Sequence, residues 1–362
     1  MKALLAAGGT GGHMFPAQAL AETLKAEGWD IAMMTDGRGK KHAGRIPADP
    51  LIEVSAATIS PRKPHKVPGG VLKLMRGVGQ AKRFIKTWQP DVVIGFGGYP
   101  AFPAIRAAQR LGVPTILHEQ NAVLGRVNRV FAAKANYVAC GFERLLRAPE
   151  KAKIEAIGNP MRDAILAASK RGYKAPTKTG EINLLIVGGS LGSSIISTTV
   201  PKAVAKLPAN LRGRLKVVQQ TREADMDEAQ ALYEAANVKA QCAPFFSDIQ
   251  THLAKAHFII ARAGASSVSE IALMGLPSLL VPLGIAMDDH QTENAKALND
   301  LNAADILPET EFTPETVENI LLERLCDSNY LETASRAAQS AARPDATARL
   351  ADLVKAVIGA AQ

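Results

Sequence analysis

Three stretches of the chain share one order, in which an apolar strand pattern is followed by a glycine-rich turn and then by a helix pattern. The turns lie at residues 8–13, 95–98 and 188–193. Strands that alternate with helices in this way predict parallel sheets. Because the order starts near residue 2 and again near residue 182, we expect an α/β protein with two Rossmann-like domains, whose parallel sheets face each other across a cleft.

The length of the chain, 362 residues, also favours two domains. Helix- and strand-breaking residues at 158–160 are followed by a polar stretch at 169–180, which predicts a boundary here. We therefore expect an N-terminal domain over residues 1–160 and a C-terminal domain over residues 161–342. The helix pattern within residues 343–362 predicts a C-terminal helix that could pack back on the N-terminal domain.

The candidate ligand site of the C-terminal domain begins at residues 258–261, an apolar strand that runs into a loop of small residues and a helix. Ser266 and Ser267 are candidate N-caps of that helix. The backbone N–H groups of its first turn, at the positive end of the helix dipole, suit a phosphate. Glu270 lies about one turn further on, where its carboxylate could accept both hydroxyls of a ribose.

A second strand pattern, at residues 279–281, brings Asp288, Asp289, His290 and Gln291 to the same edge of the sheet. Ligands of open α/β sheets bind at this carboxyl edge. Together these residues indicate a pocket for a nucleotide-sugar. The alternative is purely structural, since small residues before a helix also form simple tight turns.

The N-terminal domain carries a different kind of candidate site. The loop at residues 8–13 matches neither the P-loop of nucleoside triphosphatases nor a clean G-x-G-x-x-G fingerprint, although Asp36 keeps a dinucleotide interpretation open. His13 ends this loop and is a candidate for a role in chemistry; the alternative is a capping or packing histidine. With the second glycine turn and the polar run at residues 118–121, the loop indicates a second anionic ligand.

The net charge of +9 also suggests an anionic partner. A segment that could lie on an anionic membrane surface spans residues 59–90, where basic and apolar residues are interleaved and Asp and Glu are absent. The alternative is an ordinary amphipathic helix with a solvated basic face. Nucleic acid is not expected as a partner, because stacking aromatic residues are not regularly interleaved. The basic residues are Arg62, Lys63, Lys66, Lys73, Arg76, Lys82, Arg83 and Lys86.

Other classes of site are disfavoured. The three cysteines lie far apart and form no zinc or redox motif, which fits a reducing cytoplasm. We expect no signal peptide and no membrane span, since no apolar run approaches the roughly 20 residues required. Asp225 and Asp227 superficially resemble a metal motif, but they lie in a charged helical pattern. We therefore expect neither a metal nor another cofactor.

The motifs taken together resemble the MurG family, the glycosyltransferases of peptidoglycan synthesis. The likeness covers nearly the whole chain, with motifs at residues 8–13, 97–99, 118–121, 158–162, 188–190, 262–270 and 288–294. Each motif alone is weak, but the ordered set is specific. The resemblance implies the two-domain fold called GT-B. It also implies transfer of N-acetylglucosamine (GlcNAc) from UDP-GlcNAc to the muramoyl 4-hydroxyl of lipid I, undecaprenyl-diphosphate-MurNAc-pentapeptide, with inversion of the sugar's anomeric centre.

The resemblance further implies how the donor is held. Glu270 would bind the ribose, and Gln291 with His290 would bind the sugar hydroxyls. Phe246 would offer its backbone to uracil, with its ring as a second option. The implied donor-binding residues are Thr10, Gly11, Gly12, Asn121, Arg162, Ser190, Phe246, Ala265, Ser266, Ser267, Val268, Ser269, Glu270, His290 and Gln291.

The implied reaction needs a base for the acceptor hydroxyl and stabilisation of the departing UDP. His13 is our first choice of base because histidine titrates near neutral pH, and Glu119 and His118 are the reserves. Helix N-termini, Arg162 and Ser190 would stabilise the departing diphosphate without a metal.

The resemblance places the acceptor diphosphate at the loop of Gly12 and His13 and at a second turn formed by Gly97, Gly98 and Tyr99. The basic and apolar segment would then dock the protein peripherally on the cytoplasmic face of the inner membrane.

Three rival functions remain at this point. The nearest is another sugar-nucleotide enzyme with two domains, such as a different lipid glycosyltransferase or a UDP-sugar 2-epimerase. An NAD-dependent oxidoreductase fits less well, because the dinucleotide fingerprint is missing. A non-enzymatic alternative is a peripheral membrane adaptor that binds a UDP-sugar without turning it over.

Overall fold

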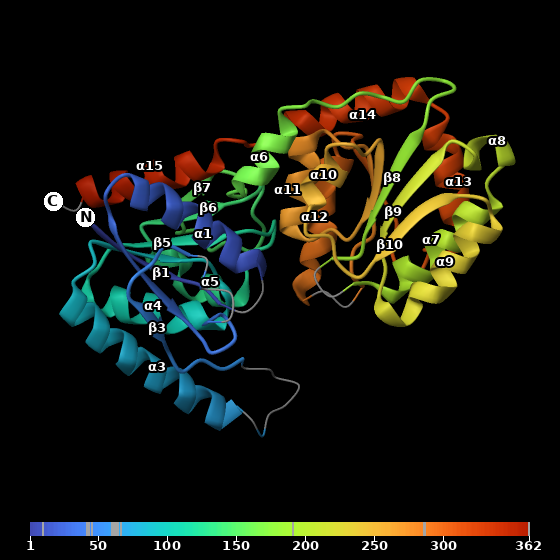
Figure 1. The fold of residues 1–362 in the computed structure, drawn as a ribbon. Coiled ribbons are helices and arrows are strands. Elements are labelled where there is room, and N and C mark those ends of the chain that lie inside the picture. Colours follow the sequence, from blue (N-terminus) through green and yellow to red (C-terminus); the bar gives the residue numbers. More distant parts are fainter. Residues whose placement is uncertain are drawn as a thin grey trace. The chain divides into compact units, whose positions relative to one another are not determined.

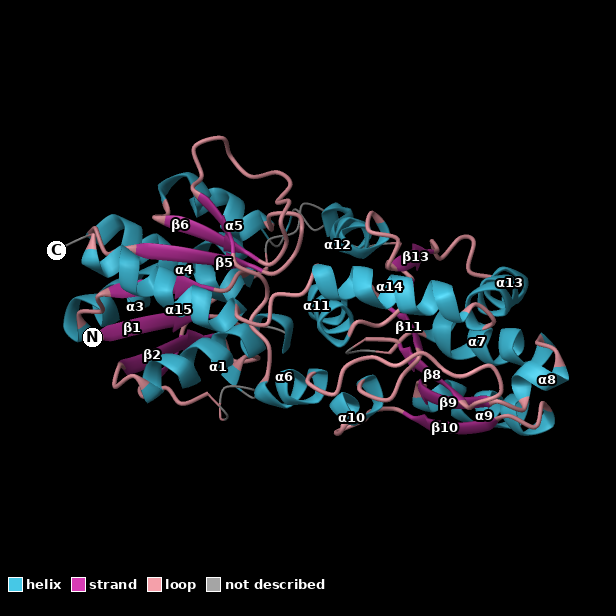
Figure 2. Ribbon diagram, turned by 90° about the horizontal axis from the view of Figure 1, so that it is seen from above, coloured by secondary structure: helices cyan, strands magenta, loops and turns pink. Residues whose placement is uncertain are grey.

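The computed structural model describes residues 1–8, 11–40, 44, 46–58, 65, 67–189, 192–284 and 287–360. The chain divides into unit 1, formed by Met1–Arg162 with Arg343–Gln362, and unit 2, formed by Asp163–Ala342. Each unit holds one parallel sheet flanked by helices (Figure 1; Figure 2). The fold class expected from the sequence, two α/β halves with parallel sheets, is confirmed.

The sheet of unit 1 has seven strands in the order β3-β2-β1-β4-β5-β6-β7. The chain first builds outward from β1 to β3 and then returns to place β4 on the other side of β1. The carboxyl ends of β1 and β4 therefore form a topological switch point, where sheets of this kind bind ligands. The strands are β1 (Lys2–Ala6), β2 (Asp30–Thr35), β3 (Leu51–Glu53), β4 (Val92–Gly95), β5 (Thr115–Glu119), β6 (Tyr137–Cys140) and β7 (Ile154–Ala156).

Two apolar layers cover the two faces of this sheet, since successive strand residues point to opposite faces. Leu5 belongs to the layer under α1 and α15, whereas Leu4 belongs to the layer under α3, α4 and α5. The C-terminal helix α15 packs on α1 and is thus part of unit 1. The described helices are α1 (Gly11–Ala26), α3 (Val67–Trp88), α4 (Gly98–Leu111), α5 (Arg126–Phe131), the 3-10 turn η2 (Ala132–Lys134) and α15 (Ala346–Gly359).

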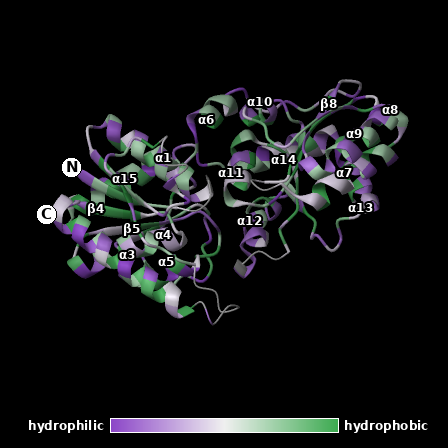
Figure 3. Ribbon diagram, turned by 60° about the horizontal axis from the view of Figure 1, so that its bottom comes forward, coloured by the Kyte–Doolittle hydropathy of each residue, from purple (hydrophilic) through white to green (hydrophobic). Residues whose placement is uncertain are grey.

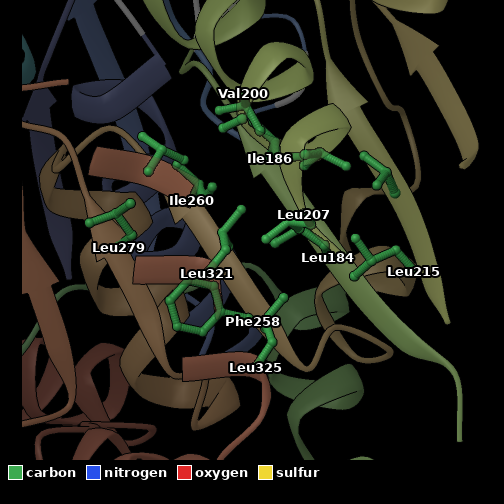
Figure 4. Packing of buried hydrophobic residues seen from close by; sticks show 14 of the residues in the cluster. Leu184, Ile186, Val200, Leu207, Leu215, Phe258, Ile260, Leu279, Leu321 and Leu325 are labelled. Atoms are coloured by element: carbon green, nitrogen blue, oxygen red, sulfur yellow. The ribbon is translucent and has the colours of Figure 1, made fainter. Parts of the chain in front are cut away.

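The sheet of unit 2 has six strands in the order β10-β9-β8-β11-β12-β13. Its switch point lies between β8 and β11. The strands are β8 (Ile182–Val187), β9 (Leu215–Gln220), β10 (Lys239–Ala243), β11 (Phe258–Ala261), β12 (Ser278–Leu280) and β13 (Ala304–Ile306). Branched and aromatic side chains of β8 and β11, among them Ile186 and Phe258, pack against α7 and α13 in one cluster (Figure 4).

The helices of unit 2 follow its strands in the expected alternation. α7 and α13 begin with side-chain caps, from Ser193 and Thr313 respectively. The described helices and 3-10 turns are α6 (Asp163–Ser169), α7 (Ser194–Lys206), α8 (Ala209–Arg212), η3 (Glu223–Asp225), α9 (Met226–Ala235), α10 (Ile249–Leu253), α11 (Ala265–Met274), η4 (Met287–Asp289), α12 (His290–Asn299), α13 (Pro314–Leu325) and α14 (Ser328–Ser340).

The first helix differs most from its expected bounds. The sequence predicts a helix from about residue 15, with Pro16 in the first turn, but α1 begins at Gly11 and contains Pro16 as an interior residue. Glycine is a poor helix former, yet Met14, Ala17 and Leu20 are buried against the sheet. Tertiary packing therefore extends the helix into the glycine loop and brings His13 onto its first turns.

Helix α3 contains most of the basic segment predicted from the sequence. Leu74, Val78 and Ile85 on one face are buried. The remainder of its surface mixes hydrophobic and hydrophilic residues (Figure 3). None of the described helices is both long enough and apolar enough to span a bilayer. The part of the basic segment at residues 59–64 and residue 66 lies outside the described residues.

Candidate active site

His13 lies at the switch point of unit 1, on the first turns of α1. Its Nδ1 atom is 2.7 Å from the carbonyl oxygen of Phe96, which follows β4, and 3.0 Å from Oε1 of Gln120, which follows β5. Both partners are carbonyl oxygens and can only accept, so Nδ1 carries the proton. The neutral ring then has its lone pair on Nε2, the arrangement that a general base requires.

The turn before α4 packs directly against this ring. Gly97 and Gly98 have φ angles of 83° and 72°, values that favour glycine. A Cβ atom on Gly97 would lie 3.3 Å from Cε1 of His13 and 3.5 Å from Nδ2 of Asn128. The absence of side chains thus leaves room for the imidazole. Tyr99 is half-buried and packs on the apolar layer under α4.

Glu119 holds the loop that follows β5. Its Oε1 accepts hydrogen bonds from the backbone and side-chain nitrogens of Asn121, at 3.2 and 3.1 Å. Its Oε2 accepts from the Gly125 N–H at 2.8 Å and from Nδ2 of Asn128 at 3.0 Å. The residue is 3% exposed. This corrects the expectation that Glu119 is a reserve base, because both carboxylate oxygens are engaged inside the fold.

His118 is also interior, with no exposed surface. Burial lowers the pKa of His118 to about 4, opposed by the Gly158 backbone and reinforced by the nearby His13. The ring is therefore neutral at pH 7 and does not reach solvent. His118 is not suited to act as a base toward a substrate, which corrects the second reserve assignment.

In unit 2 the expected phosphate loop leads into α11. The N-cap is Gly264, with extended backbone, whereas the sequence predicts Ser266 or Ser267 as the cap. The prediction is wrong by two or three residues because the helix starts immediately after the loop. The first intrahelical bond joins the Val268 N–H to the Gly264 carbonyl. The N–H groups of residues 265–267 therefore lie in the first turn, where helices leave donors for ligands.

The side chains along α11 divide into two sets. Ala265 and Val268 are buried, so that they can offer only backbone to a ligand. Ser266 is exposed, while Ser267, Ser269 and Glu270 are half-buried. Glu270 thus lies one turn beyond the free amide groups, as the sequence predicts.

Arg262 joins the strand ends around this loop, a role that the sequence did not reveal. Its Nη1 donates to the carbonyls of Val281 and Pro282 at 3.2 and 3.3 Å, and its Nη2 donates to Oγ of Ser193 at 2.8 Å and forms an ion pair with Glu309. These partners follow β12, β8 and β13. Arg262 is 9% exposed and acts as a clamp within unit 2.

Glu309 completes this clamp. Its second carboxylate oxygen accepts from the Gly284 N–H at 3.1 Å. Burial alone would raise the pKa of Glu309, but the hydrogen bonds from Arg262 and Gly284 outweigh it and lower the pKa. The carboxylate therefore stays ionised and holds the loop after β12.

The polar cluster after β12 is held by its own side chains. Oε1 of Gln291 accepts from the Leu283 N–H at 3.0 Å, so that its amide nitrogen is the group that can turn to a ligand. Oδ1 of Asp289 accepts from the Thr292 hydroxyl at 2.7 Å. Asp288 and Asp289 have φ angles of 60° and 55°, and His290 begins α12.

The remaining predicted donor residues lie in different places. Phe246 is 8% exposed and its ring packs edge-on against His252, which favours its backbone over its ring as the contact to uracil. Arg162 lies in unit 1 with its guanidinium 5.0 Å from the ring centre of Phe15. Gly11, Gly12 and Asn121 also belong to unit 1. Thr10 and Ser190 lie outside the described residues.

Asp225 and Asp227 belong to η3 and α9; Asp227 is exposed, whereas Asp225 is half-buried. Within the part of the chain that the structure describes, no three His, Cys, Asp or Glu side chains gather in a way that could hold a metal ion.

Comparison with known proteins agrees with this geometry. The glycosyltransferase family 28 N-terminal domain matches residues 3–140, and the family's C-terminal domain matches residues 183–350. A protein of Maricaulis maris (strain MCS10) is 49% identical over 99% of this chain and 98% of its own length. It is named UDP-N-acetylglucosamine--N-acetylmuramyl-(pentapeptide) pyrophosphoryl-undecaprenol N-acetylglucosamine transferase. A protein of Caulobacter vibrioides (strain NA1000 / CB15N) with the same name is 45% identical over 98% of both chains.

Solved structures give the same family. The crystal structure of Acinetobacter baumannii MurG is similar with a TM-score of 0.80 and 30% identity, over 98% of this chain and 99% of that one. A putative UDP-N-acetylglucosamine 2-epimerase from Listeria monocytogenes has a TM-score of 0.68 at 15% identity, which shows a shared fold alone. Since both halves match the family 28 domains and the relatives align from end to end, this chain is a glycosyltransferase of family 28 with the GT-B fold and belongs to the MurG family.

Proposed function

We propose that this chain is an inverting glycosyltransferase that moves GlcNAc from UDP-GlcNAc to the muramoyl 4-hydroxyl of undecaprenyl-diphosphate-MurNAc-pentapeptide, converting lipid I to lipid II. One observation carries the proposal: the chain is 49% identical, over nearly the full length of both proteins, to a protein named for this transfer. The position of His13 at the switch point of unit 1 supports it, since the reaction needs a base.

In this mechanism Nε2 of His13 takes the proton of the acceptor hydroxyl as its oxygen attacks the anomeric carbon of GlcNAc. The bond between that carbon and the diphosphate oxygen breaks, and UDP leaves with the electron pair. His13 becomes a cation, and its Nδ1–H remains bonded to the carbonyl oxygens of Phe96 and Gln120. The products are the β-linked disaccharide lipid, UDP and a proton that His13 returns to solvent.

Unit 2 is the proposed donor-binding unit. The amide groups at the start of α11 would bind the diphosphate, because a helix N-terminus favours negative charge. Glu270 would accept the ribose hydroxyls, and His290 with the amide nitrogen of Gln291 would bind the sugar. The Arg262 clamp holds the loops that carry these groups. Further proposed donor contacts are Thr10, Gly11, Gly12, Asn121, Arg162, Ser190, Phe246, Ala265, Ser266, Ser267, Val268 and Ser269.

Unit 1 is the proposed acceptor-binding unit. The turn formed by Gly97, Gly98 and Tyr99 lies against His13. Backbone without side chains allows a diphosphate to approach closely, as in other glycine-rich phosphate loops. We place the lipid diphosphate of the acceptor at this turn and at Gly12, which sets the muramoyl hydroxyl beside His13.

The outer surface of α3 is the proposed membrane-docking face. Three large apolar side chains stand in solvent there: Val71 is 44%, Leu72 is 72% and Met75 is 51% exposed. Lys73 and Arg76 are exposed in the same stretch, and Lys82, Arg83 and Lys86 follow. Exposed apolar residues beside cations fit an anionic lipid surface better than bulk water. We infer peripheral attachment at the cytoplasmic face of the inner membrane.

A UDP-release assay tests the proposed function. The purified chain is mixed with UDP-GlcNAc, with and without a lipid-diphosphate muramoyl-pentapeptide acceptor. We expect UDP release only when the acceptor is present, together with a disaccharide lipid. Release without acceptor would point to an epimerase or a hydrolase, and donor binding with no release under either condition would point to a non-catalytic adaptor.

A further inference from the structure

Gln120 lies between two histidine rings of unit 1 and is nearly buried, at 5% exposure. Its Oε1 is 3.0 Å from Nδ1 of His13, and its Nε2 is 3.1 Å from Nδ1 of His118. The same Nε2 donates to the Phe96 carbonyl at 3.0 Å. One amide side chain therefore connects the proposed base to a buried imidazole.

The contacts allow only one orientation of this amide. If Oε1 and Nε2 were exchanged, Oε1 would lie against the carbonyl oxygen of Phe96, and two acceptors would face each other. In the same exchange the NH2 group would oppose the Nδ1–H of His13. The Phe96 carbonyl thus fixes the amide, and the amide presents an acceptor to His13.

His118 reinforces this orientation from the other side. Because the NH2 group of Gln120 faces its Nδ1, that nitrogen must accept, and the proton of the neutral ring resides on Nε2. Burial lowers the pKa of His118 to about 4, while the Gly158 backbone opposes this shift and His13 adds to it. His118 therefore remains an acceptor at neutral pH.

We infer that Gln120 is a positioning residue for the transfer reaction: it holds the His13 ring with its proton on Nδ1 and its lone pair on Nε2, and it is itself held by His118. This inference rests on the proposed function, in which His13 is the base. A base is commonly oriented by a third group, and in many hydrolases this group is a carboxylate. Here the orienting group is a neutral amide, backed by a neutral imidazole.

The neutral amide suits a site that must also accept anionic substrates. The donor and the acceptor each bring a diphosphate, so a carboxylate in direct contact with His13 would add repulsion toward both. After proton transfer, the Nδ1–H of the cationic ring lies between two carbonyl oxygens, those of Phe96 and Gln120. Dipoles fixed in this way stabilise the cation without adding a negative charge.

Two variants of Gln120 and one control test the inference. Gln120→Met keeps a similar volume and removes the three side-chain hydrogen bonds, to His13, Phe96 and His118. Gln120→Glu keeps an acceptor for the Nδ1–H of His13. Gln109→Met is the control, since Gln109 in α4 also donates from Nε2 to a backbone carbonyl, that of Phe131, away from His13. The readouts are kcat, KM for UDP-GlcNAc, and ¹⁵N NMR of the histidine rings, assigned with His13→Ala and His118→Gln.

We expect Gln120→Met to lower kcat about 10- to 100-fold with KM for UDP-GlcNAc within about twofold, as for the loss of other orienting partners. Gln120→Glu should recover most of this loss in kcat, because an acceptor for the Nδ1–H of His13 is kept, while the added negative charge should raise KM for UDP-GlcNAc. In the wild-type spectra His13 should carry its proton on Nδ1 and His118 on Nε2. In Gln120→Glu the proton of His118 should move to Nδ1, so that it can donate to the new carboxylate. Gln109→Met should match the wild type in all readouts.

Three results would overturn the inference: an unchanged kcat in Gln120→Met, an equal loss in the Met and Glu variants, or a wild-type spectrum with the His13 proton on Nε2. If Gln120→Met does not fold, the Glu variant and the wild-type spectrum still decide. A wild-type protein that releases no UDP would instead refute the proposed function, while the ring spectra would continue to report on Gln120.

Discussion

The two units use the same succession of strand, glycine turn and helix, but they hold their functional edges by different means. In unit 1 the edge is held by hydrogen bonds of interior side chains, in which Gln120 links two histidines and Glu119 accepts from the following loop. In unit 2 the edge is held by one guanidinium, since Arg262 joins three strand ends and pairs with Glu309.

This difference matches what each edge has to do in the proposed reaction. A base needs a fixed tautomer, which the hydrogen bonds from Nδ1 of His13 to the Phe96 carbonyl and to the neutral Gln120 amide provide. A diphosphate needs backbone amides held in place, and a buried arginine behind the loop provides rigidity together with positive charge. Variants that act on one edge should therefore leave the other unchanged.

The largest effect is expected from His13→Ala. Removal of the base should lower kcat about 10³-fold while the affinity for UDP changes less than about twofold. Steady-state kinetics and calorimetric titration with UDP measure the two quantities. An equal loss in kcat and in UDP affinity would show that His13 binds the donor and is not the base. It would also contradict the proposed division between a base in unit 1 and donor binding in unit 2.

The second-largest expected effect is a loss of folding stability at acid pH that depends on the buried His118. Its folded-state pKa is lowered to about 4 from an ordinary value of 6.5. The unfolded chain therefore binds the proton first, and stability that is present above pH 6.5 is lost as the pH falls toward 4. The shift corresponds to about 3 kcal/mol.

Urea unfolding at pH 7 and pH 4.5 measures this loss. His118→Gln, which has no titratable group, should show a smaller decrease between the two pH values than the wild type. The wild type must be compared with His118→Gln because the carboxyl groups of the chain also titrate in this pH range. Equal decreases would show that His118 does not govern the acid sensitivity of unit 1.

The surfaces of the units should also differ in membrane affinity. Leu72→Ser combined with Met75→Ser removes two exposed apolar side chains from α3 and should weaken binding to anionic vesicles about tenfold or more. Leu322→Ser is the matched control, because Leu322 lies on α13 of unit 2 and is 38% exposed. Co-sedimentation with vesicles measures both. Equal weakening by the control would contradict a docking face on unit 1.

A smaller effect is expected from Glu309→Gln, which removes the charge that pairs with Arg262. Because the pair is only partly exposed, we expect a loss of about 1–2 kcal/mol in unfolding free energy and a higher KM for UDP-GlcNAc. Glu143→Gln is the control, since the exposed Glu143 pairs with Arg343 in unit 1 and should cost less than about 0.5 kcal/mol. A decrease in kcat alone would indicate that the clamp acts on the chemistry.

The smallest expected effect is that of chelation. Helix N-termini and cationic side chains are proposed to stabilise the departing UDP, so turnover in EDTA should equal turnover in its absence. If EDTA abolishes activity and magnesium restores it, the leaving group depends on a metal and the account of the unit 2 edge is wrong.

The fold and the outline of each site could be predicted from local patterns. Apolar runs followed by glycine turns indicate both sheets, and their repetition indicates two units. His13 and Glu270 stand out because a reactive or charged residue follows a loop of small residues. Each of these signals lies within a few consecutive residues. Over that range the local sequence largely determines the geometry of the backbone.

The direction of side chains beyond a strand end could not be predicted in this way. Glu119 ends β5 and turns inward because its partners are backbone and side-chain nitrogens of the next loop. The role of Arg262 depends on Ser193 and Glu309, which are 69 and 47 positions away in the sequence. The choice of Gly264 as the cap of α11, in place of a serine, depends on where the loop leaves the sheet.

Helix α15 has a consequence for how the protein is made. It lies at the end of the chain, yet it packs on α1 and supplies Leu350 and Val354 to the first apolar layer. Unit 1 therefore stays incomplete while the ribosome is still producing unit 2, whose residues are contiguous. A chain truncated just before residue 343 would therefore contain every residue of unit 2 but would lack one helix of the first apolar layer of unit 1, which should expose that layer to proteases.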